Sequence, residues 1–390
     1  MRATDDEPQF SSFGCLFSVC WTLLTLPIWI AAFVLLATGI TTEGRLFALA
    51  VTCLLPVPLN LLHLHSMRRK VVTALLLVVG TGALFLCANR APAHRDDPGA
   101  AARLVYQSGD SHARYSPANL VPEIDQHILG SYLFALIDPS LSWDQAADLR
   151  TDLRRIYREV ANDPDLAPLP SVLGSAYREM LGLNPRTGRL FVYLPEGNQP
   201  KPAILFLHGS LGNFQGSWQI WKSFADENGI AIVAPSFGAG NWYKKGGLEA
   251  IEQARLFCEE HPMIDSKRIV LAGLSNGGMG VTRGARATPN AWRGLIYLSP
   301  VFEQTVVDSE EFANGWAGRS VLIITGEEDK RTTPTRIREV EELMTGLTMK
   351  VESHHLPDED HFLAYSDWPK VSRLMIEWLR NEGHLSEEDP

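Results

Sequence analysis

Residues 268–279 read RIVLAGLSNGGM, an apolar run that ends at a serine with glycines two positions before and two positions after it. The run 268–274 has the continuous hydrophobicity of a buried strand, and the small residues of 276–286 favour a helix. A serine between such a strand and helix lies on a sharp turn, whose strained backbone needs close neighbours without Cβ atoms. The pattern from Gly273 to Gly277 therefore predicts that the Ser275 hydroxyl points out above a sheet.

Short apolar runs of the same kind recur on both sides of this turn. They lie at 189–194, 203–207, 230–234, 294–298 and 321–325, and helical patterns separate most of them. Strands that are apolar along their whole length are buried on both faces, which is typical of a mostly parallel sheet covered by helices. With a last strand at 349–356 and a closing helix at 368–380, the predicted fold class is α/β.

The first part of the chain contains three long segments without a charged residue, at 10–42, 46–67 and 71–89. Each is long enough to cross a hydrocarbon core of about 30 Å. Prolines 56 and 58 interrupt the second segment, but membrane helices tolerate proline. A cleaved signal peptide is the alternative for the first segment, although acidic residues precede it and its apolar run is long for one. We therefore expect an integral membrane protein with three transmembrane helices.

The orientation of these helices is predicted from basic residues in the short loops. The densest cluster, Arg68-Arg69-Lys70, lies between the second and third segments and is expected in the cytoplasm. With three crossings, the chain after Asn89 then lies on the extracytoplasmic side. Three further arginines, at 45, 90 and 95, favour the opposite orientation.

Charge and cysteine content narrow the possible partners. The net charge of -10 gives no basic surface for nucleic acid. Four of the five cysteines fall in the membrane segments, which leaves Cys258 alone in the remaining chain, without a partner for a disulfide or a metal-binding spacing. We therefore expect neither a metal nor another cofactor.

Residues 91–184 separate the membrane region, 1–90, from the region of apolar strands, 185–390. The part at 90–122 is rich in Ala, Pro, Arg, Asp and Ser and is predicted to be a linker. Two helices are expected next, at 124–137 and 143–160, the second with apolar residues at three- and four-residue spacing. We expect them to pack on the following domain or on the membrane surface; a role in gating substrate or binding a partner is the alternative.

Four motifs in the region from about 185 to 383 occur in the order found in one large family. They are His208-Gly209 after an early strand, the Gly-Leu-Ser275-Asn-Gly turn, Gly326-Glu-Glu-Asp329 after a late strand, and Asp360-His361-Phe362 before the last helix. Nucleophile, acid and histidine follow this chain order in the α/β hydrolases. The region therefore resembles the α/β-hydrolase family.

The resemblance implies a role for each of three side chains. Serine is a weak nucleophile unless a base accepts its proton, and a carboxylate must orient that base. Ser275 is the expected nucleophile, His361 the base and Asp329 the acid. Glu328, next to Asp329, is the alternative acid.

An acyl-transfer site also needs backbone N–H groups that stabilise the oxyanion. Asn276, directly after the serine, supplies one at the start of a helix. By resemblance, the second comes from Ser210 or Leu211 in the loop after His208-Gly209. His208 itself is expected to organise this loop and not to act as a second base.

The substrate pocket is predicted less directly. Trp242 and Tyr243 lie in a glycine-rich segment that follows a strand, where α/β sheets bind ligands, and are the candidate substrate-binding residues. The family often inserts a lid in the region that corresponds here to 298–320. Because this stretch is short, we expect an open or peptide-capped cleft and no large helical cap.

The combined prediction is a membrane-anchored serine hydrolase that cleaves small or lipid-like carboxylic esters through an acyl-enzyme. The Gly-Leu-Ser275-Asn-Gly-Gly turn is similar to that of some carboxylesterases, including feruloyl-esterase-like and polyester-depolymerase-like enzymes. A peptidase or amidase on the same scaffold is the first alternative, because ester and amide cleavage pass through the same kind of oxyanion. A non-catalytic sensor or scaffold with a hydrolase-like domain is the second.

Overall fold

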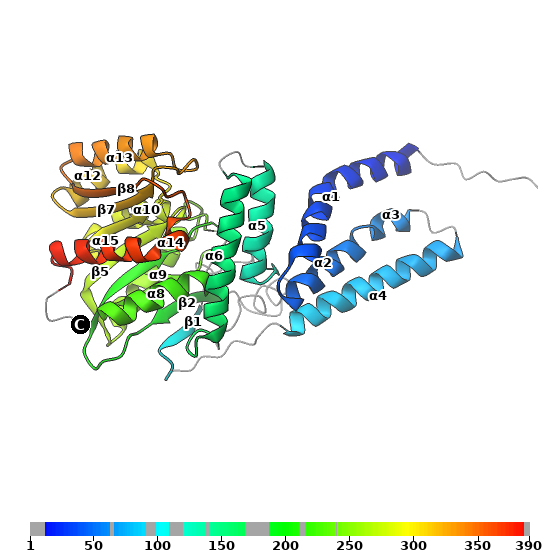
Figure 1. Ribbon diagram of the computed structural model, residues 1–390, viewed down its shortest axis with the longest axis horizontal. Helices are drawn as coiled ribbons and strands as arrows, with labels where there is room; N and C mark the ends of the chain where they lie inside the picture. Colours follow the sequence, from blue (N-terminus) through cyan, green and yellow to red (C-terminus); the bar gives the residue numbers. More distant parts are fainter. Residues whose placement is uncertain are drawn as a thin grey trace, which may run out of the picture. The chain divides into compact units, whose positions relative to one another are not determined.

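The computed structural model describes residues 12–62, 66–90, 99–108, 120–137, 141–167, 187–210, 215–238 and 240–385. The chain divides into two compact units, Met1–Ala91 and Pro92–Pro390 (Figure 1). Each unit is described separately below.

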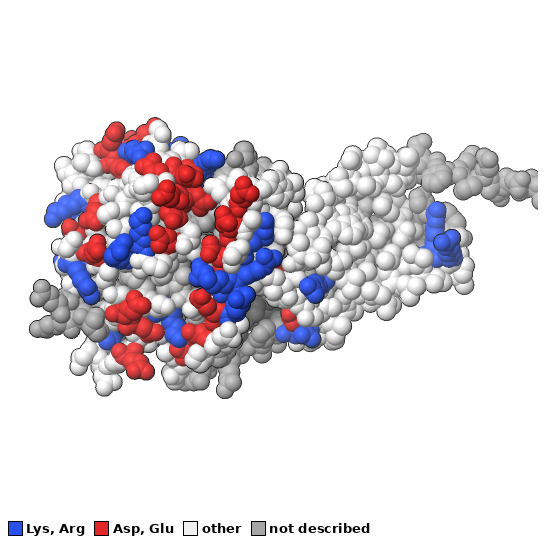
Figure 2. Space-filling model, viewed as in Figure 1, with Lys and Arg blue, Asp and Glu red and all other residues white. Residues whose placement is uncertain are grey.

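The first unit consists of helices α1 (Ser12–Thr38), α2 (Thr42–Leu54), α3 (Val57–Leu61) and α4 (Met67–Arg90). Among the described residues, three spans are long and apolar enough to cross a membrane: Gly14–Thr38, Thr42–Leu61 and Met67–Arg90. The break between α2 and α3 falls at Pro56, as the prolines predict, and the Trp21 indole N–H donates to the Leu55 carbonyl beside it at 2.9 Å. The visible face of this unit carries few charged side chains (Figure 2).

The second unit is built around one eight-stranded sheet in the order β1-β2-β4-β3-β5-β6-β7-β8. Strands β3 to β8 run parallel, and β1 and β2 are antiparallel to their neighbours. The strands are β1 (Ala102–Ser108), β2 (Thr187–Tyr193), β3 (Lys201–Leu207), β4 (Ala231–Pro235), β5 (Ile264–Leu274), β6 (Leu295–Leu298), β7 (Ser320–Gly326) and β8 (Lys350–Leu356). The mostly parallel α/β sheet is therefore as predicted.

Strand β1 corrects the prediction of a linker at 90–122. It pairs with β2 along its whole length, with Leu104 opposite Phe191. Ala102 and Leu104 are buried, whereas Arg103 between them is only partly buried. This strand has one apolar face, and its short alternating pattern lacked the continuous hydrophobicity by which the central strands were recognised.

Helices cover both faces of the sheet and bury alternate strand residues. One face packs on α8 (Gln215–Asn228) and α15 (Trp368–Asn381), the other on α9 (Gly247–Glu260), α10 (Gly277–Ala287) and α13 (Pro334–Gly346). In β3, for example, Phe206 belongs to the first apolar core and Leu205 to the second. The shorter elements are η2 (Pro289–Ala291), α11 (Gln304–Val307), α12 (Glu310–Trp316) and α14 (Leu363–Ser366).

Helices α5 (Glu123–Ile137) and α6 (Trp143–Asn162) form close to their predicted bounds. Ser142 begins α6 with a capping box, in which its hydroxyl accepts from the Gln145 N–H and the Gln145 side chain accepts from the Ser142 N–H. The apolar positions at three- and four-residue spacing are all buried, namely Ala146, Leu149, Leu153, Ile156 and Val160.

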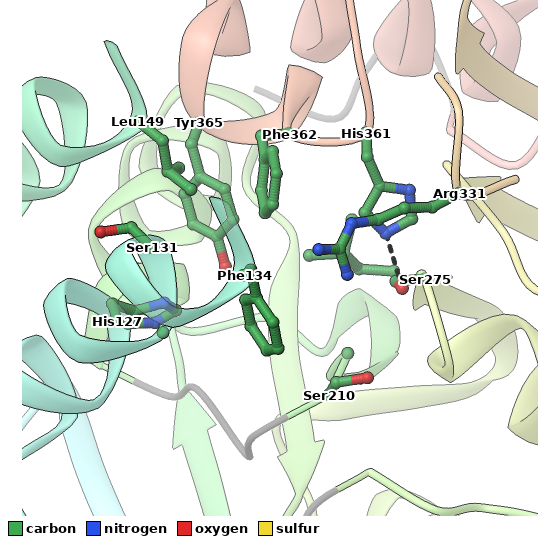
Figure 3. A pocket seen from close by; sticks show the side chains of 13 residues that line it. His127, Ser131, Phe134, Leu149, Ser210, Ser275, Arg331, His361, Phe362 and Tyr365 are labelled. Atoms are coloured by element: carbon green, nitrogen blue, oxygen red, sulfur yellow. Dashed lines mark hydrogen bonds between the residues drawn. The ribbon is translucent and has the colours of Figure 1, made fainter. Parts of the chain in front are cut away.

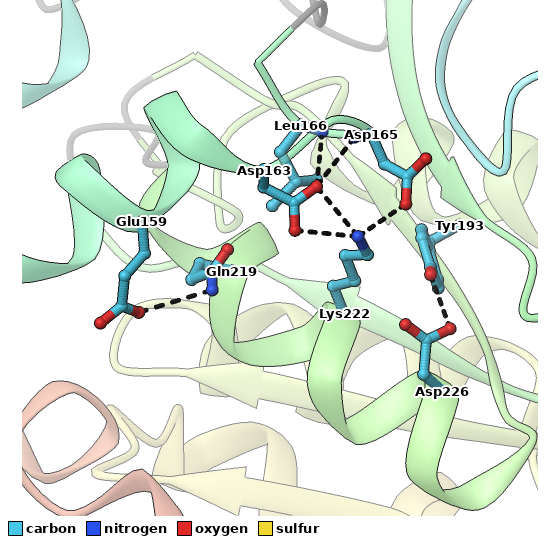
Figure 4. Close-up of polar contacts among 8 residues, drawn as sticks. All are labelled: Glu159, Asp163, Asp165, Leu166, Tyr193, Gln219, Lys222 and Asp226. Atoms are coloured by element: carbon cyan, nitrogen blue, oxygen red, sulfur yellow. Dashed lines mark hydrogen bonds and ion pairs between the residues drawn. The ribbon is translucent and has the colours of Figure 1, made fainter.

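Two polar clusters hold the α5–α6 pair on α8. Glu123 accepts hydrogen bonds from the Tyr157 hydroxyl at 2.8 Å and from the Gly216 N–H at 3.2 Å. At the end of α6, Lys222 of α8 contacts the carboxylates of Asp163 at 2.8 Å and Asp165 at 2.6 Å (Figure 4). The pair is thus part of the second unit's packed structure, which agrees with the expectation that it packs on the following domain.

Candidate active site

The turn between β5 and α10 places Ser275 in a strained backbone conformation. Its φ of 52° lies in the left-handed region that non-glycine residues rarely adopt. A Cβ atom on Gly273 would come within 2.6 Å of the Gly277 backbone, and one on Gly277 within 2.1 Å of the Leu207 carbonyl oxygen. The two glycines are therefore required for the sharp turn, as their spacing predicts.

Ser275, His361 and Asp329 lie in a hydrogen-bonded line. The Ser275 hydroxyl is 2.9 Å from His361 Nε2 (Figure 3). His361 Nδ1 is 2.8 Å from Asp329 Oδ2. The serine follows β5, the aspartate follows β7 and the histidine follows β8. Residues that are far apart in sequence thus meet at the carboxyl ends of the parallel strands β5, β7 and β8.

Asp329 is the carboxylate that the structure brings to the histidine. Its Oδ1 accepts the N–H groups of Arg331 and Thr332, both at 2.8 Å, and its Oδ2 accepts the Thr332 hydroxyl at 2.6 Å. Burial alone would raise the pKa of the Asp329 carboxyl, but hydrogen bonds from His361 and Thr332 outweigh this effect and lower it. Glu328, the alternative acid, is exposed.

The loop after β3 passes directly beside the serine. A Cβ atom on Gly209 would lie 3.4 Å from the Ser275 Cβ, and one on Gly240 would come within 2.2 Å of the Gly209 carbonyl oxygen. Asn276 begins α10 and its side-chain amide donates to the Ser210 hydroxyl at 2.8 Å. The structure thus brings two predicted oxyanion-hole residues together, whereas Leu211 lies outside the described residues.

The His208 side chain connects this loop to the segment after β4 by hydrogen bonds. Its Nε2 accepts the Phe237 N–H at 3.1 Å, so Nδ1 carries the proton and donates to the Gly209 carbonyl at 2.7 Å. Burial lowers the pKa of His208 to about 4, which keeps the imidazole neutral at pH 7. These contacts agree with the predicted role as an organiser of the loop.

Trp242 and Tyr243, the predicted substrate-binding residues, do not line the cavity at Ser275. Trp242 is fully buried, and its indole N–H donates to the His208 carbonyl at 2.9 Å. Tyr243 is 46% exposed, and neither residue lines the cavity at Ser275. The glycine-rich segment after β4 brings Trp242 under the loop and not into the site, because a buried indole N–H needs a hydrogen-bond acceptor.

A cavity of about 310 Å³ opens beside Ser275. One side is formed by the serine, His361 and the loop after β3, and the opposite side by α5 and α6. Its lining residues are His127, Gly130, Ser131, Phe134, Leu149, Gly209, Ser210, Leu274, Ser275, Arg331, His361, Phe362 and Tyr365, most of which are shown in Figure 3.

This cavity corrects the expectation of an open or peptide-capped cleft. The segment between β6 and β7 forms only the short helices α11 and α12, and no residue of it lines the cavity. The wall comes from α5 and α6 instead, which precede the central part of the sheet. Helical periodicity showed that these helices have a buried face, but it could not identify the structure against which that face packs.

The order of strands and the placement of the site together define the fold of the second unit. A mostly parallel sheet carries helices on both faces, a serine on a strained turn after β5, an acid after β7 and a histidine after β8. The second unit has the α/β-hydrolase fold. We refer to it below as the hydrolase-fold unit.

Known proteins are similar to parts of this chain. No family model matches the sequence. The bifunctional acetylxylan esterase/xylanase XynS20E of Neocallimastix patriciarum is 34% identical over 97 residues, which are 23% of this chain and 14% of that protein. The chain thus matches about one seventh of the length of this curated relative.

Solved structures of serine hydrolases and esterases are similar over half of the chain. The match to the serine hydrolase FphF of Staphylococcus aureus covers 50% of this chain and 92% of the FphF chain, with 19% identity and a TM-score of 0.41. Est1E from Butyrivibrio proteoclasticus covers 50% and 94%, with 15% identity and a TM-score of 0.41.

Proposed function

We propose that the protein is a membrane-anchored serine hydrolase that cleaves carboxylic esters through an acyl-enzyme. The observation that carries this proposal is the hydrogen-bonded line from Ser275 through His361 to Asp329. Ser275, at one end of this line, borders a cavity large enough for a small acyl group. The esterase activity named for the relative XynS20E supports the choice of an ester substrate.

In the first half of the reaction, Ser275 Oγ attacks the ester carbonyl carbon while His361 Nε2 accepts the hydroxyl proton. Asp329 stabilises the imidazolium through its hydrogen bond to Nδ1. The carbonyl oxygen becomes an oxyanion, which the backbone N–H of Asn276 at the start of α10 stabilises together with the loop at Ser210. The tetrahedral intermediate then releases the alcohol, which takes the proton from His361, and Ser275 retains the acyl group as an ester.

Water completes the cycle. His361 accepts a proton from a water molecule as its oxygen attacks the acyl carbon, and a second oxyanion forms at the same position. Collapse of this intermediate releases the carboxylic acid and returns the proton to Ser275. Apart from the ester and water, the proton transfers of both halves need only Ser275, His361 and Asp329.

The site is tested by labelling with a fluorophosphonate probe and by hydrolysis of short acyl esters. The full-length protein is expected to react with the probe at one residue, and Ser275→Ala is expected to abolish labelling and turnover. Ser223→Ala removes an exposed hydroxyl of α8 and serves as the matched control with normal activity. An unlabelled but folded wild-type protein would favour a non-catalytic sensor, and turnover of amides without esters would favour an amidase.

The three spans of the first unit support anchoring in a membrane, and the cluster at 68–70 supports an extracytoplasmic hydrolase-fold unit. Carbonate extraction should leave the protein in the membrane fraction. Protease added to intact cells should cleave the hydrolase-fold unit. If this unit faced the cytoplasm, the same treatment would leave it uncleaved. Substitution of all three basic residues by alanine should weaken this orientation, whereas Arg45→Ala should not.

A further inference from the structure

Arg331 brings a guanidinium group to the cavity beside Ser275. It lies in the loop after β7, two residues beyond Asp329, and its side chain extends toward the cavity (Figure 3). The guanidinium carbon is 5.0 Å from the ring centre of Phe134 on α5 and 5.7 Å from that of Phe362. Both distances are in the range of cation–π contacts, which hold the charged end of the side chain between two walls of the cavity.

The described residues that line this cavity contribute positive charge and no carboxylate. Arg331 has a permanent positive charge, and none of the others is an aspartate or a glutamate. His127, at the α5 wall, adds no charge at pH 7, because burial lowers its pKa to about 4. An anionic ligand therefore meets an attractive charge here and no carboxylate of the described lining that would repel it.

The two nearest carboxylates of the described residues accept hydrogen bonds from other groups, and Asp360 also interacts electrostatically with Arg331. Asp329 accepts hydrogen bonds from His361, Thr332 and the Arg331 backbone, and the Asp360 carboxylate accepts the Phe362 N–H at 2.8 Å. A guanidinium has five N–H donors in a planar fork, so it can bind an incoming carboxylate at one edge while its other donors make different contacts.

We propose that Arg331 selects esters that carry an anionic group close to the scissile bond, such as half-esters of short dicarboxylic acids. This inference rests on the proposed esterase function and names its substrate class. The guanidinium binds the anion, the rings of Phe134 and Phe362 contact the short carbon chain, and the ester carbonyl lies at Ser275. Arg331 is thus a specificity-determining residue.

The test compares the hydrolysis of matched esters by the full-length protein. p-Nitrophenyl hemisuccinate carries a carboxylate on the acyl side, and p-nitrophenyl pentanoate is a neutral ester of similar length. 3-Carboxyphenyl butyrate and phenyl butyrate are the corresponding pair for the alcohol side. We expect the wild-type kcat/KM to favour the anionic member of at least one pair, which also shows on which side of the ester the charge is bound.

The variants separate charge recognition from a structural role. Arg331→Gln should lower kcat/KM for the preferred anionic ester by about 10- to 100-fold, mainly through KM, and leave the neutral ester nearly unchanged. Arg331→Lys should restore part of the preference. Arg336→Gln removes an exposed charge from α13 nearby and should leave both substrates unaffected.

Three results would overturn the inference. Hydrolysis of neutral esters with no preference for charge in the wild type would refute the role of Arg331 while the esterase function stands. An equal loss for neutral and anionic esters in Arg331→Gln would show that the side chain only supports the site. No turnover of any ester by a protein unreactive toward fluorophosphonate would remove the proposed function and this inference together.

Discussion

Tyr157 of α6 donates a 2.8 Å hydrogen bond to Glu123 of α5, and both side chains are buried. The same carboxylate accepts the N–H of Gly216 at the start of α8, so one group joins the two helices of the cavity wall to α8. Burial and the adjacent carboxylate raise the pKa of Tyr157 well above its ordinary value, which keeps its hydroxyl protonated as a donor.

Removal of this hydroxyl should loosen the wall of the cavity. We expect Tyr157→Phe to lower the free energy of unfolding by about 1 to 3 kcal/mol, because the buried Glu123 carboxylate loses a donor. Denaturant unfolding monitored by tryptophan fluorescence measures this loss. Tyr132→Phe makes the same change on α5 and serves as the control. Equal stability of Tyr157→Phe and the wild type would show that the bond contributes nothing to the fold.

The turn at Ser275 should not tolerate a methyl group at Gly277. Its Cβ would come within 2.1 Å of the Leu207 carbonyl oxygen, so Gly277→Ala should cost about 3 kcal/mol or more and abolish fluorophosphonate labelling. Gly346→Ala at the end of α13 places its methyl group in open space and should be neutral or slightly stabilising. Normal labelling of Gly277→Ala would contradict the packing of the turn.

Substitutions at Asp329 and Glu328 should show which of the two carboxylates acts as the acid. Asp329→Asn keeps the size of the side chain but no longer stabilises the imidazolium or fixes its tautomer. We expect a fall in kcat of about 10⁴-fold for ester hydrolysis. Glu328→Gln should retain wild-type kcat, because this side chain is exposed. The opposite result for the two variants would assign the acid to Glu328.

The buried His208 should make the fold sensitive to mild acid. Its pKa is about 4 in the folded protein and about 6.5 in an unfolded chain, so the unfolded state binds the proton first as the pH falls. Stability should be greatest above pH 6.5 and fall progressively toward pH 4, by up to about 3 kcal/mol from this residue. Unfolding curves between pH 4 and 8 measure the slope, which His208→Asn should reduce. An unchanged slope would mean that other groups cause the acid sensitivity.

The central sheet and the turn at Ser275 could be predicted from the sequence because their signals are local. A buried strand, a turn with two obligatory glycines and a helix lie within residues 264–287, and each constrains the next. The acid and the histidine were predicted from their order along the chain, and the structure places both beside Ser275. Their catalytic roles stay predictions until the variants are measured.

The walls of the cavity were not predicted, because they depend on contacts between distant segments. Phe134 and Leu149 lie on helices whose periodicity shows a buried side but not its neighbour. Arg331 directly follows Glu-Glu-Asp-Lys in the sequence. Nothing in this context distinguishes a side chain that lines a cavity from one that lies in solvent. Trp242 was misplaced for the same reason, since its acceptor, the His208 carbonyl, is distant in sequence.

The origin of the cavity wall has a practical consequence for shortened forms of the protein. A chain that begins at residue 185 would retain Ser275, Asp329 and His361, but it would lack β1 and both wall helices. Strand β2 would then become an exposed edge, open to pairing with other chains. Such a fragment would lack the α5 and α6 side of the cavity beside Ser275, so an activity measured on it would not represent that of the intact protein.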